Sequence, residues 1–224
     1  MNDDRPPPIF IADARGLDFL NSVATPTDAQ VEWLPSGDDL VKWLVHAGMV
    51  PAEVPALFGK NAVPGELDAV AAKARALREW FRSFVYRHKG APLGASALEQ
   101  LEPLNQVLAR DEEFGEIVAR APSGDLRHDD GHDHVHSDET RLPGFVLRQR
   151  RRWRSPDTLL LPIARAMADL ICDDDFSRVK ACEGASCTLV FIDRTRRRTR
   201  RWCSMALCGN RAKQQAHRDR IKST

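Results

Sequence analysis

The chain has 224 residues, of which 42% are hydrophobic, so it is long enough for one domain with a hydrophobic core and one small additional module. No apolar run approaches the length of a membrane span, and no apolar segment follows a basic start, so we expect a cytoplasmic protein without a membrane span or signal peptide. The formal net charge of +1 hides an uneven distribution: residues 177–224 contain thirteen Lys and Arg against three Asp and Glu, which is +10 and leaves −9 on the remainder. The basic end favours a polyanionic partner.

Residues 9–24 predict a first helix, in which two polar residues, Asp18 and Asn21, lie three apart on one face. One interpretation places Asp18 and Asn21 in a pocket, together with Arg78 from a later helix. The other, which we favour, makes Asp18 and Asn21 a capping or core-edge hydrogen-bonding pair.

Further helices are predicted from caps and apolar spacing. Ser36 is a plausible N-cap for a second helix, and Gly48 follows its end. The longest helix is predicted after Pro64 and is ended by Gly90; its apolar residues keep the three- and four-residue spacing, and its basic side chains are expected on solvated faces. Ser96 and Glu99 match a capping box before another helix.

Residues 115–120 and 144–153 predict the two strands of a hairpin, and a long His- and Asp-rich segment links them. Four histidines lie between residues 125 and 140, namely His128, His132, His134 and His136. Imidazole and carboxylate groups together can hold zinc, nickel or copper. The alternative, which we favour, is a polar loop with adventitious metal affinity, because nothing nearby fixes the orientation of the rings.

Four of the five cysteines form two Cys-x4-Cys pairs that are separated by fifteen residues: Cys182, Cys187, Cys203 and Cys208. Four thiolates can close a tetrahedron around zinc. Clustered cysteines in a reducing compartment are more typical of metal ligands than of disulfides. The sequence therefore predicts one structural Zn²⁺ ion. The fifth cysteine, Cys172, falls in a helix predicted from residue 155 onward and is expected to be a small buried residue.

The residues around the cysteines predict a small module. Residues 188–193 alternate like a strand and can pair with residues 200–203, which leaves a basic turn between them exposed. The residues after Cys208 have helical propensity, and a helix at the second cysteine pair is typical of treble-clef-like modules, whereas a ribbon would use strands throughout. The predicted fold class is mainly α with a small β-hairpin and a C-terminal treble-clef-like or ribbon-like zinc module, and we favour the treble clef.

Arginine and glutamine side chains of this module are candidate nucleic-acid contacts. Arg and Gln read guanine and adenine edges in a major groove, and one face of the C-terminal helix carries Arg211, Gln214, Gln215 and Arg218. Phosphate contacts are expected from the basic turn, at Arg194, Arg196, Arg197, Arg198, Arg200 and Arg201. Asn210 and Arg211 have a structural alternative: Asn210 could bond a cysteine sulfur and Arg211 could pair with Asp193.

The run CSMALCGNR, which ends at Arg211, resembles the CGNR-type zinc-finger proteins of bacteria. In these proteins an N-terminal ABATE domain precedes the finger, and the segments LDFLNS, EWLPSGDDLVKWLVHAGMV, ARALREWF and LLLPIARAMADLI are similar to that domain. The resemblance implies an ABATE-like helical domain over residues 1–176 and a CGNR finger over residues 177–224, with zinc held by the four cysteines. It also implies a stress-induced transcription regulator whose finger binds DNA. The His-rich segment resembles an insertion into this pattern.

These observations favour a regulator in which the finger binds DNA, or RNA, and the helical domain senses a ligand or a protein partner. The charge difference also fits a protein-interaction module, in which the basic finger docks on an acidic surface of another protein or of the N-terminal domain. The least favoured alternative is an enzyme or small-molecule-binding protein with a site at Asp18, Asn21 and Arg78. We expect no enzyme, because the sequence has no Gly-rich phosphate loop, Gly-x-Ser-x-Gly or His-Glu-x-x-His motif.

Overall fold

The structure is a computed structural model that describes residues 5–26, 28–59, 63–120 and 144–222. The chain divides into two compact units, Met1–Arg110 with Trp153–Thr224 and Asp111–Arg152. The four histidines predicted as adventitious ligands, His128, His132, His134 and His136, lie outside the described residues, so their metal affinity stays a prediction. Among the helices of the described ranges, none has the length and apolar character that a bilayer crossing requires.

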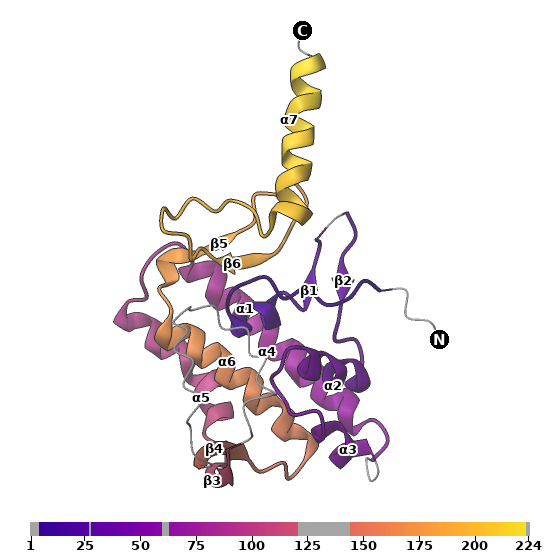
Figure 1. Ribbon diagram of the computed structural model, residues 1–224, viewed down its shortest axis with the longest axis vertical. Coiled ribbons are helices and arrows are strands. Elements are labelled where there is room, and N and C mark those ends of the chain that lie inside the picture. Colours follow the sequence, from indigo (N-terminus) through magenta and orange to yellow (C-terminus); the bar gives the residue numbers. More distant parts are fainter. Residues whose placement is uncertain (1–4, 27, 60–62, 121–143, 223–224) are drawn as a thin grey trace. The chain divides into compact units, whose positions relative to one another are not determined.

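The larger unit is mainly helical (Figure 1). Its α-helices are α1 (Arg15–Leu20), α2 (Gly37–His46), α3 (Val54–Gly59), α4 (Glu66–His88), α5 (Glu102–Leu108), α6 (Leu160–Asp173) and α7 (Asn210–Lys222). Its antiparallel strand pairs are β1 (Val23–Ala24) with β2 (Val31–Glu32), and β5 (Val179–Ala181) with β6 (Val190–Ile192). Short 3₁₀ helices span Ala95–Leu101, Pro156–Leu159 and Phe176–Arg178. The predicted class, mainly α with a small β-hairpin, is confirmed, and the β structure consists of two-stranded sheets.

The core forms where apolar stripes of the helices meet. In α4 the buried residues recur at helical spacing from Val70 to Val85, as the sequence predicts. α1 approaches α6 closely at Gly16, where a Cβ atom would lie only 2.7 Å from the carbonyl oxygen of Ala166. A larger residue at position 16 would therefore push α1 off α6. This packing places the segment after α1, residues 21–26, against the C-terminal module.

The ends of the helices confirm some local predictions and correct others. Ser36 caps α2, because its Oγ accepts a hydrogen bond from the Asp39 amide at 3.2 Å. Gly48 has a φ of 62°, the left-handed conformation that glycine adopts easily after a helix. The capping box at Ser96 is wrong, since the chain forms a 3₁₀ helix there, and its N-cap, Gly94, makes no side-chain hydrogen bond.

Two side chains differ from their predicted burial. Cys172 is exposed, because it lies in the last turn of α6, beyond the buried stripe that ends at Leu170. Arg78 in α4 is only 3% exposed, although helical basic residues were expected to face solvent. Its partners, described below, explain how the charge is accommodated.

The C-terminal module begins with β5, which pairs with β6 in the register Val179 with Ile192 and Ala181 with Val190. The predicted pairing of residues 188–193 with residues 200–203 is therefore wrong. The physical reason is burial: Val179 and all of β6 are buried, whereas Arg201 is exposed. The β6 residues belong to the same hydrophobic core as α1, α4 and α6. The C-terminal module is thus not a free-standing unit but shares the core of the helical part.

The smaller unit contains the predicted hairpin, formed by β3 (Glu113–Ala119) and β4 (Phe145–Arg151). The two strands are antiparallel, and seven residue pairs run from Glu113 opposite Arg151 to Ala119 opposite Phe145. Arg151 also forms ion pairs at its own end of the hairpin, with Asp111 at 2.6 Å and with Glu113 at 2.6 Å. The sequence prediction of this hairpin is confirmed.

Candidate metal centre

The sulfur atoms of Cys182, Cys187, Cys203 and Cys208 all lie within 4.8 Å of one another. Cys182 directly follows β5, and Cys208 lies in the π-helical turn Met205–Gly209 that leads into α7. Cys182, Cys203 and Cys208 are buried, and Cys187 is half-buried. The two pairs, distant in sequence, thus converge on one point. Among the described residues, this is the one grouping of three or more His, Cys, Asp or Glu ligands.

The distances between the sulfurs fit a tetrahedral metal ion. Four sulfurs about 2.3 Å from a zinc ion stand about 3.8 Å apart along the edges of the tetrahedron. The Sγ atoms of Cys187 and Cys203 are 3.9 Å apart, and those of Cys203 and Cys208 are 3.5 Å apart. A four-sulfur set is also the donor set that zinc prefers in closed structural sites.

Hydrogen bonds among the thiols shift the pKa values of three of the four cysteines. Hydrogen bonds from Cys187 and Cys203 lower the pKa of Cys182 to about 2. The hydrogen bond to Cys182 raises the pKa of Cys187 to about 12, and hydrogen bonds to Cys182 and Cys187 raise the pKa of Cys203 well above its usual range. The thiolate of Cys182 is therefore stabilised by hydrogen bonds from the thiols of Cys187 and Cys203. A divalent cation at the centre would replace the thiol protons and allow four thiolates.

Main-chain groups around Cys182 suit a charged sulfur. The amides of Gly184 and Cys203 donate to its Sγ at 3.4 and 3.2 Å. Gly184 leaves no room for a side chain, because a Cβ atom there would lie 2.9 Å from the Sγ of Cys208. The loop between the first two cysteines can therefore close over the cluster only with glycine at this position.

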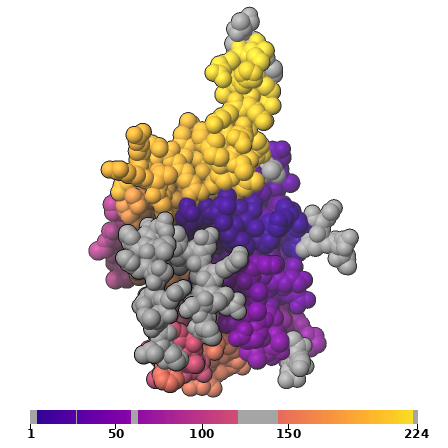
Figure 2. Space-filling view, viewed as in Figure 1, coloured from indigo at the N-terminus to yellow at the C-terminus, as the bar shows by residue number. Residues whose placement is uncertain are grey.

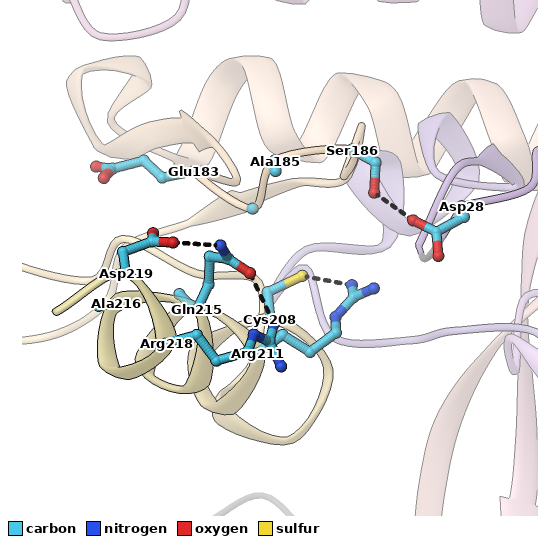
Figure 3. A pocket seen from close by; sticks show the side chains of 12 residues that line it. Asp28, Glu183, Ala185, Ser186, Cys208, Arg211, Gln215, Ala216, Arg218 and Asp219 are labelled. Atoms are coloured by element: carbon cyan, nitrogen blue, oxygen red, sulfur yellow. Dashed lines mark hydrogen bonds between the residues drawn. The ribbon is translucent and has the colours of Figure 1, made fainter. Parts of the chain in front are cut away.

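Arg211 links the cluster to the helical part of the unit, and Figure 3 shows its hydrogen bond to Cys208. Its Nη2 donates to the Sγ of Cys208 at 3.4 Å and to the carbonyl oxygen of Pro26 at 2.6 Å, while Nε donates to the carbonyl oxygen of Leu207 at 2.7 Å. The hydrogen bond to Cys208 raises the pKa of Arg211. Arg211 therefore has structural contacts, although they do not include the Asp193 pairing considered above.

Comparison with protein families matches residues 13–174 to ABATE, described as "Putative stress-induced transcription regulator". The chain belongs to the ABATE family. Residues 178–221 match the CGNR zinc finger, a range that contains all four cysteines and nearly all of α7. The resemblance carried by CSMALCGNR is thereby confirmed. A search of curated proteins gave no match.

The ABATE part holds the CGNR finger through the main chain of β6. Asn21, only 2% exposed, donates from Nδ2 to the carbonyl oxygen of Val190 at 2.8 Å and accepts from the Val190 amide at Oδ1 at 3.0 Å. Asp18, one turn earlier, accepts from the Ala12 amide at 3.1 Å, and burial raises the pKa of Asp18 to about 6. Both side chains therefore make core-edge hydrogen bonds, which is the kind of role that the favoured interpretation gives them.

Arg78 lies in a different place, at a polar cavity of about 430 Å³ between α4 and the β1–β2 pair. Its guanidinium donates to both carboxylate oxygens of Glu32, at 2.8 and 2.5 Å, and to the Oγ of Ser22 at 2.9 Å. The cavity also reaches the finger, because Thr188 lines it. Thr188 accepts from the amide of Thr25 at 2.8 Å, so ABATE and finger meet at this cavity.

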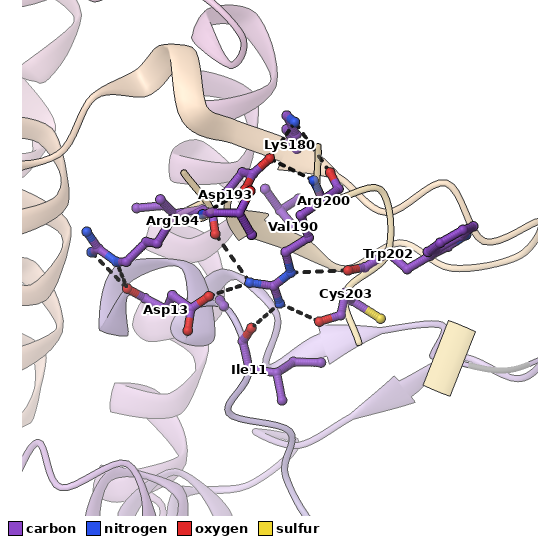
Figure 4. Close-up of polar contacts among 12 residues, drawn as sticks. Ile11, Asp13, Lys180, Val190, Asp193, Arg194, Arg200, Trp202 and Cys203 are labelled. Atoms are coloured by element: carbon purple, nitrogen blue, oxygen red, sulfur yellow. Dashed lines mark hydrogen bonds and ion pairs between the residues drawn. The ribbon is translucent and has the colours of Figure 1, made fainter. Parts of the chain in front are cut away.

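Arg200 joins the finger to the N-terminal segment (Figure 4). Its guanidinium donates to the carbonyl oxygen of Ile11 at 3.0 Å and forms an ion pair with Asp13. It also lies over the ring of Phe191, 4.2 Å from the centroid. These contacts assign Arg200, predicted as a phosphate contact, to the junction between ABATE and finger.

Asp193 fixes the base of the arginine loop, which we define as residues 194–201. It is fully buried and accepts from the Nζ of Lys180 at 2.7 Å, the Oγ1 of Thr195 at 2.5 Å and the amide of Arg200 at 2.9 Å. Burial alone would raise the pKa of Asp193, but these hydrogen bonds outweigh it and lower the pKa well below its usual range. The carboxylate thus stays charged and anchors both ends of the loop.

The remaining arginines of the loop have unequal surroundings. Three are paired with carboxylates: Arg194 with Asp174 at 2.9 Å, Arg198 with Asp175 at 3.6 Å and Arg201 with Glu183 at 2.6 Å. Arg196 and Arg197 are exposed, and neither forms an ion pair within the described part of the chain. Of the arginines predicted to contact phosphates, four are therefore held in ion pairs, and Arg196 and Arg197 can reach a phosphate without breaking one.

α7 is exposed at every position from 213 to 221 and extends away from the cysteine cluster (Figures 1 and 2). One face, with Arg211, Gln215 and Arg218, lines a groove of about 550 Å³ against the loop that begins at Glu183 (Figure 3). Gln215 is also tied to Arg218, whose Nη2 donates to it at 2.7 Å. Gln214 does not line the groove. The four residues predicted to read bases therefore do not share one face of α7: Gln214 lies outside the face that carries the other three.

Proposed function

We propose that this chain is a zinc-dependent transcription regulator whose CGNR finger contacts DNA and whose ABATE part senses a ligand. The observation that carries the proposal is α7, a polar and basic helix that starts at the cysteine cluster and is exposed from residue 213 to residue 221. Membership of a family described as a stress-induced transcription regulator supports the regulatory role. We propose no catalytic role for any residue.

The geometry of α7 suits a major groove. The groove of B-DNA admits an α-helix, and a 13-residue helix is about 20 Å long, which is enough to reach several base pairs. The available face of α7 carries Lys213, Gln214 and His217, none of which lines the groove against the loop that begins at Glu183. Arg196 and Arg197 would add phosphate contacts without breaking an ion pair. Zinc, held by the four cysteines, would supply a structural cross-link that fixes the start of α7.

Metal content is the first test. We expect one zinc ion per chain in native mass spectra of the purified protein, and Cys208→Ser should lose it. Cys172→Ser is the matched control, because Cys172 is exposed and lies outside the cluster. Equal zinc content in both variants would contradict the assignment of the cluster.

DNA binding is tested with the zinc-loaded full chain and a labelled duplex, by fluorescence anisotropy over a range of salt concentrations. The logarithm of affinity should fall against the logarithm of salt concentration by about 0.9 for each phosphate neutralised. Replacing Arg196 and Arg197 by alanine removes two proposed phosphate contacts and should make that slope shallower by about 1.8. Arg165→Ala, in α6, should not change the slope. Absence of salt-sensitive binding in the parent protein would contradict the proposal.

The cavity beside Arg78 is the proposed sensing site. Its other lining groups include Gln30, Glu79, Arg82 and Tyr86, which suit a small polar ligand. Arg82 also donates to the carbonyl oxygens of Leu20 and Val23, at 2.6 and 3.3 Å, and the following residues contact the finger. A ligand bound to Arg82 would therefore act on the segment that holds β6.

This part of the proposal is tested by screening polar metabolites for a rise in unfolding temperature. A hit should be lost in Arg82→Ala and retained in Arg87→Ala, on the same helix but outside the cavity lining. A hit that survives Arg82→Ala would place the ligand elsewhere.

The ion pairs between finger and ABATE also favour a second function, in which the basic finger docks on an acidic protein surface. Arg194 and Arg198 already bind carboxylates of the ABATE part in this way. Polyglutamate and duplex DNA, compared at equal charge and salt, separate the two functions. Binding of DNA at least about tenfold tighter supports the regulator, and equal binding supports the docking module.

A further inference from the structure

The β3–β4 hairpin has one strongly apolar face. The register pairs Ile117 with Leu147 and Ala119 with Phe145, so these four side chains share a face. Ile117 is 72% exposed, Phe145 77% and Leu147 67%. Adjacent large apolar side chains with such exposure mark an interaction surface more often than a solvated one.

The opposite face of the hairpin is charged at its middle. Glu116 pairs with Arg148 in the register and accepts from the Nε of Arg150 at 2.8 Å. Val118 and Val146 also pair on this opposite face, but the most exposed large apolar side chains of the hairpin, Ile117, Phe145 and Leu147, all lie on the first face. A two-stranded hairpin alone is marginally stable in water, which is a second reason to expect a cover on the apolar face.

We propose that the cover is the same face of a second copy of this chain, so that the hairpin is a dimerisation element. The charges of the face support a second copy. Glu113 and Arg151 stand opposite each other at one end of this face, where Arg151 is paired with Asp111 and Glu113 of its own chain, and the apolar residues occupy the other end. A two-fold axis parallel to the strands lays β3 on β4 of the second copy with the ends aligned. Apolar residues then meet apolar residues, and Glu113 meets Arg151 of the second copy.

Other arrangements fit less well. A two-fold axis perpendicular to the strands would set the charged end of one copy on the apolar end of the other. An unrelated partner would not need the face to be self-complementary. The face is also small, since seven-residue strands are about 23 Å long. It is therefore well below the standard interface of about 1,600 Å², and we expect a weak, reversible dimer.

Sedimentation velocity of the full chain, from low to high micromolar concentration, tests the dimer. The parent protein should shift from monomer to dimer as the concentration rises, and Leu147→Glu should weaken association by at least about tenfold. Leu98→Glu is the matched control, because Leu98 is 68% exposed and lies in the other compact unit. Circular dichroism confirms that each variant is folded.

A charge exchange tests the orientation of the two copies. Glu113→Arg and Arg151→Glu should each weaken self-association, because each puts like charges against each other across the two-fold axis as well as within its own hairpin. An equimolar mixture of the two variants should restore the dimer, which only contacts between chains can explain. A parent protein that stays monomeric at all concentrations would overturn the proposal. So would equal effects of Leu147→Glu and Leu98→Glu, or a mixture that associates no better than its components.

Discussion

The side chain of Asn21 forms both main-chain hydrogen bonds of Val190 that a neighbouring strand would otherwise form. Its amide group donates to the Val190 carbonyl oxygen at 2.8 Å and accepts from the Val190 amide at 3.0 Å, as one strand residue does to another. β5 pairs with β6 in the same sheet, and Asn21 satisfies both main-chain groups of Val190. Since Val190 is fully buried, these groups have no access to water. The ABATE part and the CGNR finger therefore depend on each other for hydrogen bonds as well as for the core.

Asn21→Ala should destabilise the whole unit, because it leaves two buried main-chain groups of Val190 without partners. Each such group costs about 1–3 kcal/mol, so we expect a loss of about 2–6 kcal/mol in the free energy of unfolding, measured by urea denaturation of the zinc-loaded protein. Asn105→Ala, at an exposed site in α5, is the control and should change the free energy by less than about 0.5 kcal/mol. Similar small losses in both variants would show that the Asn21 pairing is dispensable.

Arg211→Lys should accelerate zinc loss. The guanidinium reaches Cys208, Pro26 and Leu207 at once, and a single ammonium group cannot match that fork geometry. Loss of a hydrogen bond to a metal ligand typically costs about 10–100-fold in metal affinity, so transfer of zinc to a chromogenic chelator should be at least about tenfold faster. Arg218→Lys is the control on the same helix. If Arg211→Lys keeps the parental zinc and loses only DNA affinity, base contact is its role instead.

The parts of the fold that depend on local patterns could be predicted from the sequence. The apolar spacing of α4 reports its buried face, Ser36 reports the start of α2, and the paired strands of the β3–β4 hairpin follow from their alternation. The four cysteines were predictable for a similar reason. Their residue type and spacing determine which chemistry they can perform, whatever the rest of the fold does.

The junction between ABATE and finger could not be predicted, because it depends on partners far apart in the chain. Residues 200–203 and β5 are both near enough in sequence to pair with β6, and only tertiary burial selects β5. Arg78 is buried because Glu32 of β2 pairs with it at the cavity between α4 and the β1–β2 pair, which no helical periodicity reports. One signal was present: residues 189–192 read LVFI, and four successive apolar residues indicate a strand covered on both faces. Such a strand does not suit a free-standing finger.

Asp18 should make stability depend on pH near 6. Burial raises the pKa of Asp18 from 3.8 to about 6, so above pH 6 the folded protein carries an ionised, poorly solvated carboxylate. As the pH falls through 6, the folded state binds a proton that the unfolded state does not, and this group's contribution to the free energy of unfolding increases. Asp18→Asn should therefore be more stable than the parent at pH 7.5, by on the order of 2 kcal/mol, with the advantage shrinking below pH 6.

The measurement for Asp18 is urea denaturation of parent and variant at pH 7.5 and pH 5.5. Comparing the two proteins at each pH cancels the pH dependence of zinc binding, which they share. Asp169→Asn, at an exposed site in α6, should show no such change with pH. A stability difference between Asp18→Asn and the parent that is equal at both pH values would mean that the carboxyl titrates normally.

The carboxylates of Asp174 and Asp175 should compete with DNA for the arginine loop. They pair with Arg194 and Arg198, two residues predicted to contact phosphates, so a phosphate at either guanidinium has to compete with a carboxylate. Replacing both aspartates by asparagine should raise affinity for duplex DNA by about 3–10-fold at low salt and steepen the salt dependence. Asn at position 175 can still accept the hydrogen bond from Ser177, so the local turn is retained. The matched control, Asp157→Asn with Asp169→Asn, removes the same charge from pairs with Lys73 and Arg165. An equal gain in the control would assign the effect to net charge, and no gain in either would show that Arg194 and Arg198 do not contribute to DNA binding.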